Sequence, residues 1–124
     1  MRENMGLYRG KLRKSDQWVK GNLLVWKNGN CSILINDLES NTKLPMEVDP
    51  ETVGQFTGLY DKNNNKIFEG DIVLLPKLYT EKKGVVRFCG TAFRVRNIFS
   101  YQLAESVEII GNIYDNPELL KEGA

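Results

Sequence analysis

Histidine is absent from the 124-residue chain, and this limits the chemistry that the protein can perform. Without imidazole the chain cannot build a Ser-His or Cys-His nucleophilic site, a histidine general base or a histidine-ligated zinc centre. Long apolar runs are absent as well, because basic residues interrupt the first 25 residues and leave no stretch of signal-peptide or membrane-span length. We therefore expect a cytoplasmic protein with no membrane partner.

Cysteine is scarce, and neither sign of charge dominates. Cys31 and Cys89 lie far apart in apolar contexts without a Cys-x-x-Cys pair, which predicts two small core residues in a reducing compartment. Net charge alternates between successive segments: +4 for residues 1–45, −4 for 46–75, +5 for 76–104 and −4 for 105–124. Such blocks are most often neighbouring elements that complement each other, with a one-sided basic face as the alternative.

The residues that are present indicate one soluble domain over residues 1–124, with 41% apolar and 27% charged side chains. Short apolar stretches alternate with polar residues and end at Gly or Asn, which is typical of seven to nine short strands. The clearest hairpin joins Gln17–Trp26 to Cys31–Ile35, and a second joins Gly84–Cys89 to Ala92–Ile98. We expect a mostly β, small antiparallel barrel-like fold, SH3-like or related and partly open.

Helical content is predicted to be limited to one or two short turns. Asp49 can cap a turn that begins at Pro50, and Asn116 precedes Pro117 in the same way. The polar stretch at residues 36–43 is expected to form a loop.

Three parts of the chain resemble one known family. The longest resembles the signature of the YopX-like proteins of phages and prophages: Thr52-Val53-Gly54-Gln55-Phe56-Thr57-Gly58-Leu59-Tyr60-Asp61-Lys62-Asn63, followed by Lys66-Ile67-Phe68-Glu69-Gly70-Asp71-Ile72-Val73. Residues 8–11 with 18–23, and residues 107–120, are similar to the same family, so the likeness covers nearly the whole chain. It implies a mostly β, barrel-like fold carried on a mobile element in a bacterial host cytosol, without a known reaction, cofactor or ligand.

One position departs from the family pattern inside the signature. Asn64 stands where the family usually has the glycine of its Asp-Lys-Asn-Gly turn. Asn is the non-glycine residue best suited to the left-handed backbone region, so the turn is expected to survive.

The signature is interpreted first as a set of residues that shape the fold. Its members are Thr57, Gly58, Leu59, Asp61, Lys62, Asn63, Ile67, Glu69, Gly70 and Asp71. The Glu69-Gly70-Asp71 step resembles the entry to the first long strand of small SH3-like barrels, where Gly allows a bend and the acid anchors turn amides. Two alternatives stay open: the carboxylates of Asp61, Glu69 and Asp71 hold Mg²⁺ or act as acid and base, or they form an acidic docking edge.

The second hairpin carries the candidate nucleic-acid face. Strand alternation places Arg87, Arg94 and Arg96 on one side, with Lys82 and Lys83 just before them. Arginines near aromatic residues suit phosphate contacts combined with base stacking. The alternative is an ordinary solvated strand whose arginines pair with the acidic segments.

These observations lead to a hypothesis of a non-enzymatic accessory protein derived from a phage or prophage. It would act as a binding module for a host or phage protein or for a second copy of itself. Nucleic-acid binding is the second hypothesis, and a metal-dependent hydrolase using the three carboxylates is the third. No cofactor and no catalytic residue is expected.

Overall fold

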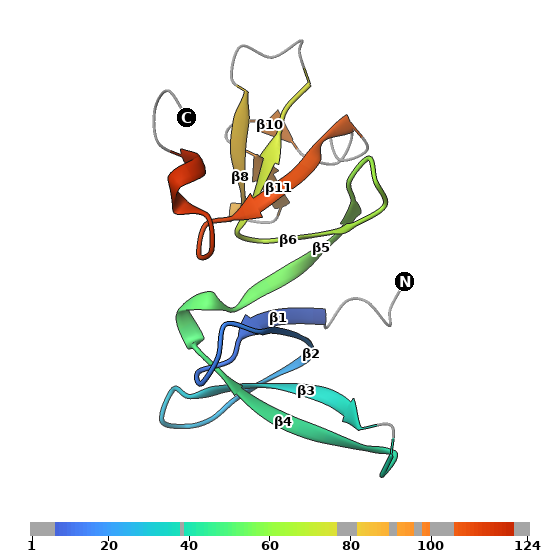
Figure 1. Cartoon of the computed structure of the whole chain (residues 1–124), viewed down its shortest axis with the longest axis vertical. Coiled ribbons are helices and arrows are strands. Elements are labelled where there is room, and N and C mark those ends of the chain that lie inside the picture. The colour runs from blue at the N-terminus through green and yellow to red at the C-terminus, as the bar shows by residue number, and fades with distance from the viewer. Residues whose placement is uncertain are drawn as a thin grey trace. The chain divides into compact units, whose positions relative to one another are not determined.

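The computed structural model describes residues 7–37, 39–76, 82–89, 92–95, 98–99 and 106–120, and these residues are mostly β-strand (Figure 1). The chain falls into two compact units, unit 1 from Met1 to Phe56 and unit 2 from Thr57 to Ala124. The two short helical turns predicted at Pro50 and Pro117 are confirmed, and both are 3₁₀: η2 (Pro50–Thr52) and η4 (Pro117–Leu120). The expectation of a single domain over residues 1–124 stays a prediction.

Unit 1 is an antiparallel meander in the order β4-β3-β2-β1-β5. Its strands are β1 (Leu7–Lys11), β2 (Trp18–Val25), β3 (Cys31–Asp37), β4 (Thr42–Val48) and the first residues of β5 (Gly54–Tyr60). An isolated bridge between Leu12 and Val48 joins the end of β1 to the end of β4, through bonds of 2.8 and 3.3 Å. The strands therefore curl toward a barrel that closes at one corner and stays open elsewhere.

The curl of unit 1 depends on two glycines where the backbone comes close to a neighbour. A Cβ at Gly10 would lie 2.8 Å from Cγ2 of Val48, and a Cβ at Gly21 would overlap the carbonyl oxygen of Leu34. The core of the unit lies on this concave side, around the buried side chains of Ile33 and Val48. A side chain at either glycine would push the curled strands apart.

Unit 2 is built on a five-stranded sheet in the order β10-β9-β8-β7-β11, with antiparallel neighbours. Its strands are β6 (Lys66–Phe68), β7 (Asp71–Leu74), β8 (Lys83–Cys89), β9 (Ala92–Val95), β10 (Ile98–Phe99) and β11 (Glu108–Asn112). The sheet packs one face on a core of Ile67, Val73, Leu75, Val86 and Val107. The rest of β5 continues into unit 2 and lies next to β6.

Both predicted hairpins are confirmed. Val25 lies opposite Cys31 in the first, where Gly29 adopts a φ of +92° in the connecting turn. In the second, β8 pairs with β9. Cys31 is buried as expected, while the side chain of Cys89 lies outside the described part of the structure.

Two expectations about local structure are wrong. The loop predicted over residues 36–43 is shorter, because β3 continues to Asp37 and β4 begins at Thr42, with the two residues paired. Strand β6, a three-residue segment within the signature, was not expected. The described residues contain eleven strands rather than seven to nine, since strands as short as β6 and β10 leave little periodicity in a sequence.

In the portion of the chain that the structure describes, no helix is both long enough and apolar enough to cross a membrane.

The close approach at Gly21 predicts a large effect of a small substitution. Gly21→Ala should lower the free energy of unfolding by about 2 kcal/mol or more, because the added methyl group meets backbone that cannot rotate away. Asn22→Ala, at the exposed position next to it, is the matched control and should change stability by less than about 0.5 kcal/mol. Urea unfolding compares the two, and equal midpoints would contradict the role assigned to Gly21.

Candidate functional site

Asp61 is a buried side chain of the family signature in unit 2 that accepts three backbone hydrogen bonds. It is 4% exposed and begins the turn between β5 and β6. One carboxylate oxygen, Oδ1, accepts hydrogen bonds from the backbone N–H groups of Asn63 (2.9 Å) and Asn65 (2.8 Å). The other, Oδ2, accepts from the N–H of Ile109 in β11, at 3.0 Å. A single carboxylate thus holds a turn and a strand that is 48 residues away in sequence.

The same donors determine the ionisation of Asp61. Burial of the carboxyl group raises its pKa, but the backbone N–H groups of Ile109, Asn65 and Asn63 favour the charged form and outweigh burial. The net result is a pKa below the ordinary value of 3.8. Asp61 is therefore a carboxylate at neutral pH, with its oxygens directed at amide donors.

The Asn-rich turn adopts the geometry that the sequence predicts. Asn64 has a φ of +67°, which confirms that asparagine takes the left-handed position usually filled by glycine. Its N–H donates to the carbonyl oxygen of Asp61 at 2.9 Å, and the N–H of Asp61 donates to the carbonyl of Asn65 at 2.9 Å. Lys62, next in the turn, forms an ion pair of 3.6 Å with Glu108 of β11.

Other polar side chains of the signature also bond to the backbone. The Thr57 hydroxyl donates to the carbonyl of Ile67 (2.8 Å) and accepts from the N–H of Leu59 (3.1 Å), around Gly58 at a φ of +84°. Oδ2 of Asp71 accepts from the N–H of Phe68 at 2.8 Å, across a bend in which Gly70 has a φ of +97°. The glycine bend and the acid that anchors a turn amide are thus both present.

The hypothesis of a three-carboxylate metal or acid–base site gains no support from this arrangement. Asp61 and Asp71 each bind backbone donors, and Glu69 is half-buried beside Gly70. Within the residues that the structure describes, no group of three His, Cys, Asp or Glu side chains is placed to hold a metal ion.

Sequence reasoning missed a second cluster of capping side chains, at the end of β11. Oδ1 of Asn112 accepts from the N–H groups of Tyr114 (3.0 Å) and Asp115 (2.9 Å), while Oδ1 of Asn116 accepts from the N–H of Asn112 (3.2 Å). The available signal was Asn112 followed by Asp115, Asn116 and Pro117, because Asn side chains commonly bond backbone amides two or three residues ahead. These bonds shape the turn that leads into η4.

The unit 2 sheet has an outer face, opposite the face that packs on the core. Strand alternation and register place on it, among others, Leu74 of β7, Lys83, Val85 and Arg87 of β8, and Glu108 of β11. Leu74 is 40% exposed and Arg87 is also exposed, whereas Ile72, earlier on the same face of β7, is fully buried. The outer face is therefore open at the Leu74 end of β7.

Part of the candidate nucleic-acid face coincides with the outer face. Arg87 lies directly opposite position 94 in the β8–β9 hairpin, so the two arginine positions share a face. Lys83 lies on that face too, and Lys82 is exposed at the start of the strand. Arg96, the third predicted arginine, lies outside the described residues.

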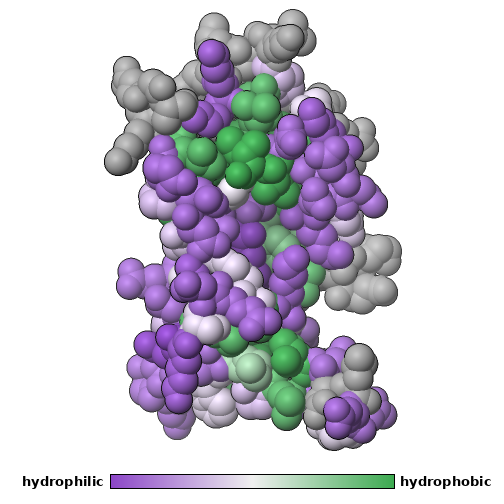
Figure 2. Space-filling model, viewed as in Figure 1, coloured by the Kyte–Doolittle hydropathy of each residue, from purple (hydrophilic) through white to green (hydrophobic). Residues whose placement is uncertain are grey.

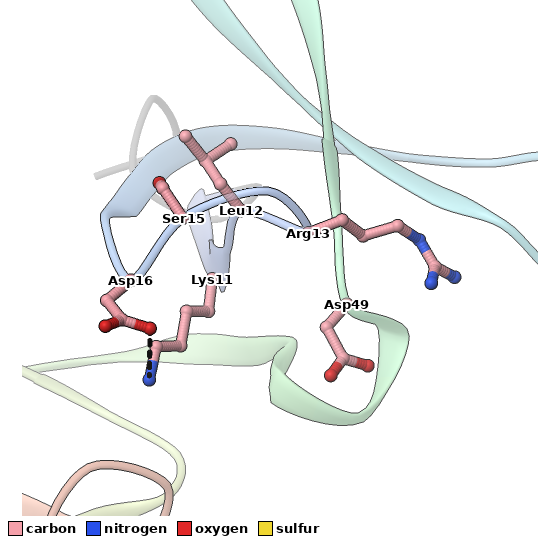
Figure 3. Close-up of a pocket in the computed structure, with 6 residues that line it drawn as sticks. All are labelled: Lys11, Leu12, Arg13, Ser15, Asp16 and Asp49. Atoms are coloured by element: carbon pink, nitrogen blue, oxygen red, sulfur yellow. Dashed lines mark ion pairs between the residues drawn. The ribbon is translucent and has the colours of Figure 1, made fainter.

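Unit 1 contains a polar hollow of about 290 Å³ that sequence reasoning did not foresee (Figure 3). It is lined by Lys11, Leu12, Arg13, Ser15, Asp16 and Asp49. Lys11 and Asp16 face each other at 3.9 Å, while the guanidinium of Arg13 points away from them and pairs with Glu47 at 3.0 Å. Because the lining has two basic and two acidic side chains, the hollow does not select a ligand of either sign.

Taken together, these features define a β protein whose turns are fixed by bonds from side chains to the backbone. The chain belongs to the YopX protein family, whose model matches residues 7–121. Among solved structures it is similar to the crystal structure of protein EF1440 from Enterococcus faecalis, at 22% sequence identity and a TM-score of 0.56. That match covers 94% of this chain and 97% of the other and shows a shared fold, while among curated proteins none matches.

Loss of the Asp61 charge should destabilise the protein in a pH-dependent way. Asp61→Asn should lower the free energy of unfolding by about 2–3 kcal/mol at pH 7, because three partly buried backbone amides lose an ionised acceptor. Because the pKa of Asp61 is lower in the folded protein, its ionised carboxylate stabilises the fold at pH values above the ordinary pKa of 3.8. This stabilisation is lost as the pH falls through the pKa of the folded state. The difference between wild type and variant, measured by urea unfolding, should therefore shrink in that acidic range.

The control for this measurement is Asp16→Asn, whose side chain is fully exposed and, among the described residues, pairs with Lys11 alone at 3.9 Å. It should change stability by less than about 0.5 kcal/mol. An Asp61→Asn protein as stable as this control at pH 7 would contradict the interpretation of the signature turn.

Proposed function

We propose that this YopX-family protein is a non-catalytic binding module that recognises another protein through the outer face of unit 2. The observation that carries the proposal is the orientation of the signature side chains: the described polar contacts of Thr57, Asp61 and Asp71 go to backbone groups of the protein itself. The signature accordingly shapes the fold, and recognition is assigned to exposed surface. In keeping with the family resemblance, the module would be an accessory protein of a phage or prophage acting in the cytosol of the host.

The outer face has the composition of a small protein-docking surface. Leu74 is an exposed apolar side chain next to the half-buried Val85, and charged side chains surround them. An apolar centre with a charged rim is the usual arrangement in protein interfaces. Burial of the apolar centre excludes water and stabilises the complex, and the charges of the rim favour a partner of complementary charge. Figure 2 shows apolar side chains gathered over β8 and β11, with hydrophilic side chains on both sides.

The test compares two leucines of nearly equal exposure. Leu74→Asp should abolish binding, whereas Leu44→Asp in unit 1, where Leu44 is 41% exposed, should leave it unchanged. Proteins captured from nuclease-treated bacterial lysate by the wild-type chain are purified and titrated against all three forms. Binding that is saturable and at least tenfold weaker for Leu74→Asp alone supports the proposal. No saturable protein ligand, or equal loss in both variants, contradicts it.

Nucleic-acid binding is the second candidate, and the pairing of the two arginine positions 87 and 94 favours it. Like charges directly opposite each other on a sheet are unfavourable unless an anion lies between them, and a phosphate would supply that anion. Lys83 extends the same basic surface toward the start of β8.

Reversal of the charge at Arg87 distinguishes nucleic-acid binding at this face from general attraction between the protein and an anionic oligonucleotide. Arg87→Glu should weaken binding of a mixed single-stranded oligonucleotide pool at least tenfold at low salt, and wild-type binding should fall steeply as salt rises. Lys27→Glu makes the same change of charge at an exposed turn of unit 1 and should have little effect. Fluorescence anisotropy measures both, and the absence of wild-type binding at low salt would eliminate the candidate.

A further inference from the structure

The outer face contains a row of three residues with opposite charges at its two ends. Leu74 of β7 is paired in register with Lys83 on one side and with Glu108 on the other. A base, an exposed leucine and an acid therefore lie side by side across three adjacent strands. The order of the row is fixed by backbone pairing, so it does not depend on how the side chains rotate.

A row of this kind is complementary to itself. Rotation by 180° about an axis that lies in the docking plane, above Leu74 and parallel to β7, brings a second copy face to face with the first and exchanges the basic and acidic ends. We infer that a second copy of this chain docks on the outer face about such a two-fold axis, with Lys83 of each copy opposite Glu108 of the other. The two Leu74 side chains meet at the axis, which is the arrangement expected of an isologous contact.

The acidic side chain that flanks Leu74 is accessible to a second copy. The ion pair between Glu108 and Lys62 has side-chain exposures of 38% and 50%, so both groups are solvated and the carboxylate can accept a further cation. Arg87 extends the basic end along β8, on the same face. Like-charge contacts would arise if the two-fold axis ran along the row, perpendicular to β7, so the row also selects one orientation.

The contact is expected to be weak. Its apolar centre is one leucine with the half-buried Val85, and interfaces of small area associate at high protein concentration. Mass measured by light scattering should rise from the 14.2 kDa of a single chain toward twice that value over roughly 5 to 500 μM at low salt. The inference deepens the proposed function, because it names one occupant of the same face.

Charge reversal in single variants and in mixtures tests the contact. Lys83→Glu and Glu108→Lys should each weaken self-association at least tenfold, since each places like charges opposite one another. An equimolar mixture of the two variants should regain it, because the mixed dimer contains two favourable pairs. The double variant Lys83→Glu/Glu108→Lys should also associate. Leu74→Asp should remain a monomer, while Leu44→Asp, the control, should behave as wild type.

Circular dichroism establishes that each variant is folded, and recovery in the mixture cannot arise from a change within one chain. A wild-type chain that stays at 14.2 kDa throughout the range overturns the inference, as does a mixture that fails to regain association. If that monomer still binds a captured protein through Leu74, self-docking is wrong and the proposed function stands. If the chain self-associates but binds no other protein, the self-docking inference stands and recognition of another protein through this face is wrong.

Discussion

The carboxylate of Asp61 is the interaction on which the arrangement of unit 2 depends. Its two oxygens accept one hydrogen bond from a backbone N–H of β11 and two from the turn between β5 and β6. One carboxylate therefore links a local turn to a strand that is distant in sequence. A buried carboxylate is stable only when such donors surround it. Because Ile109 is held in this way, the neighbouring Glu108 is placed beside Leu74, which sets the acidic end of the row on the outer face.

Turn chemistry of the same kind recurs through the parts of the chain that define the family. Gly58 and Gly70 adopt positive φ beside Thr57 and Asp71, which bond to backbone groups across their bends. Asn112 performs the equivalent role after β11. A signature made of turns constrains backbone conformation, and it leaves the chemistry of exposed strands free to differ between proteins that share the fold. This is why the function is assigned to the outer face.

Sequence reasoning succeeded where the determining interactions are local. The turn at Gly29, the left-handed Asn64 and the capped turn at Pro50 follow from residues within four positions of one another. It could not foresee the bond from Asp61 to Ile109, because nothing local links residues so far apart. In the apolar run Ile72-Val73-Leu74-Leu75, Leu74 is exposed while the other three side chains are buried, because an apolar run does not itself show which faces are covered.

The most direct test of the role of Asp61 is an NMR titration of its side-chain carboxyl carbon in the folded protein, together with the backbone amides that it accepts. We predict a pKa below 3.8, with the amide resonances of Asn63, Asn65 and Ile109 shifting at the same midpoint. A pKa at or above that value, or an Ile109 amide that does not respond to the titration, would contradict this prediction.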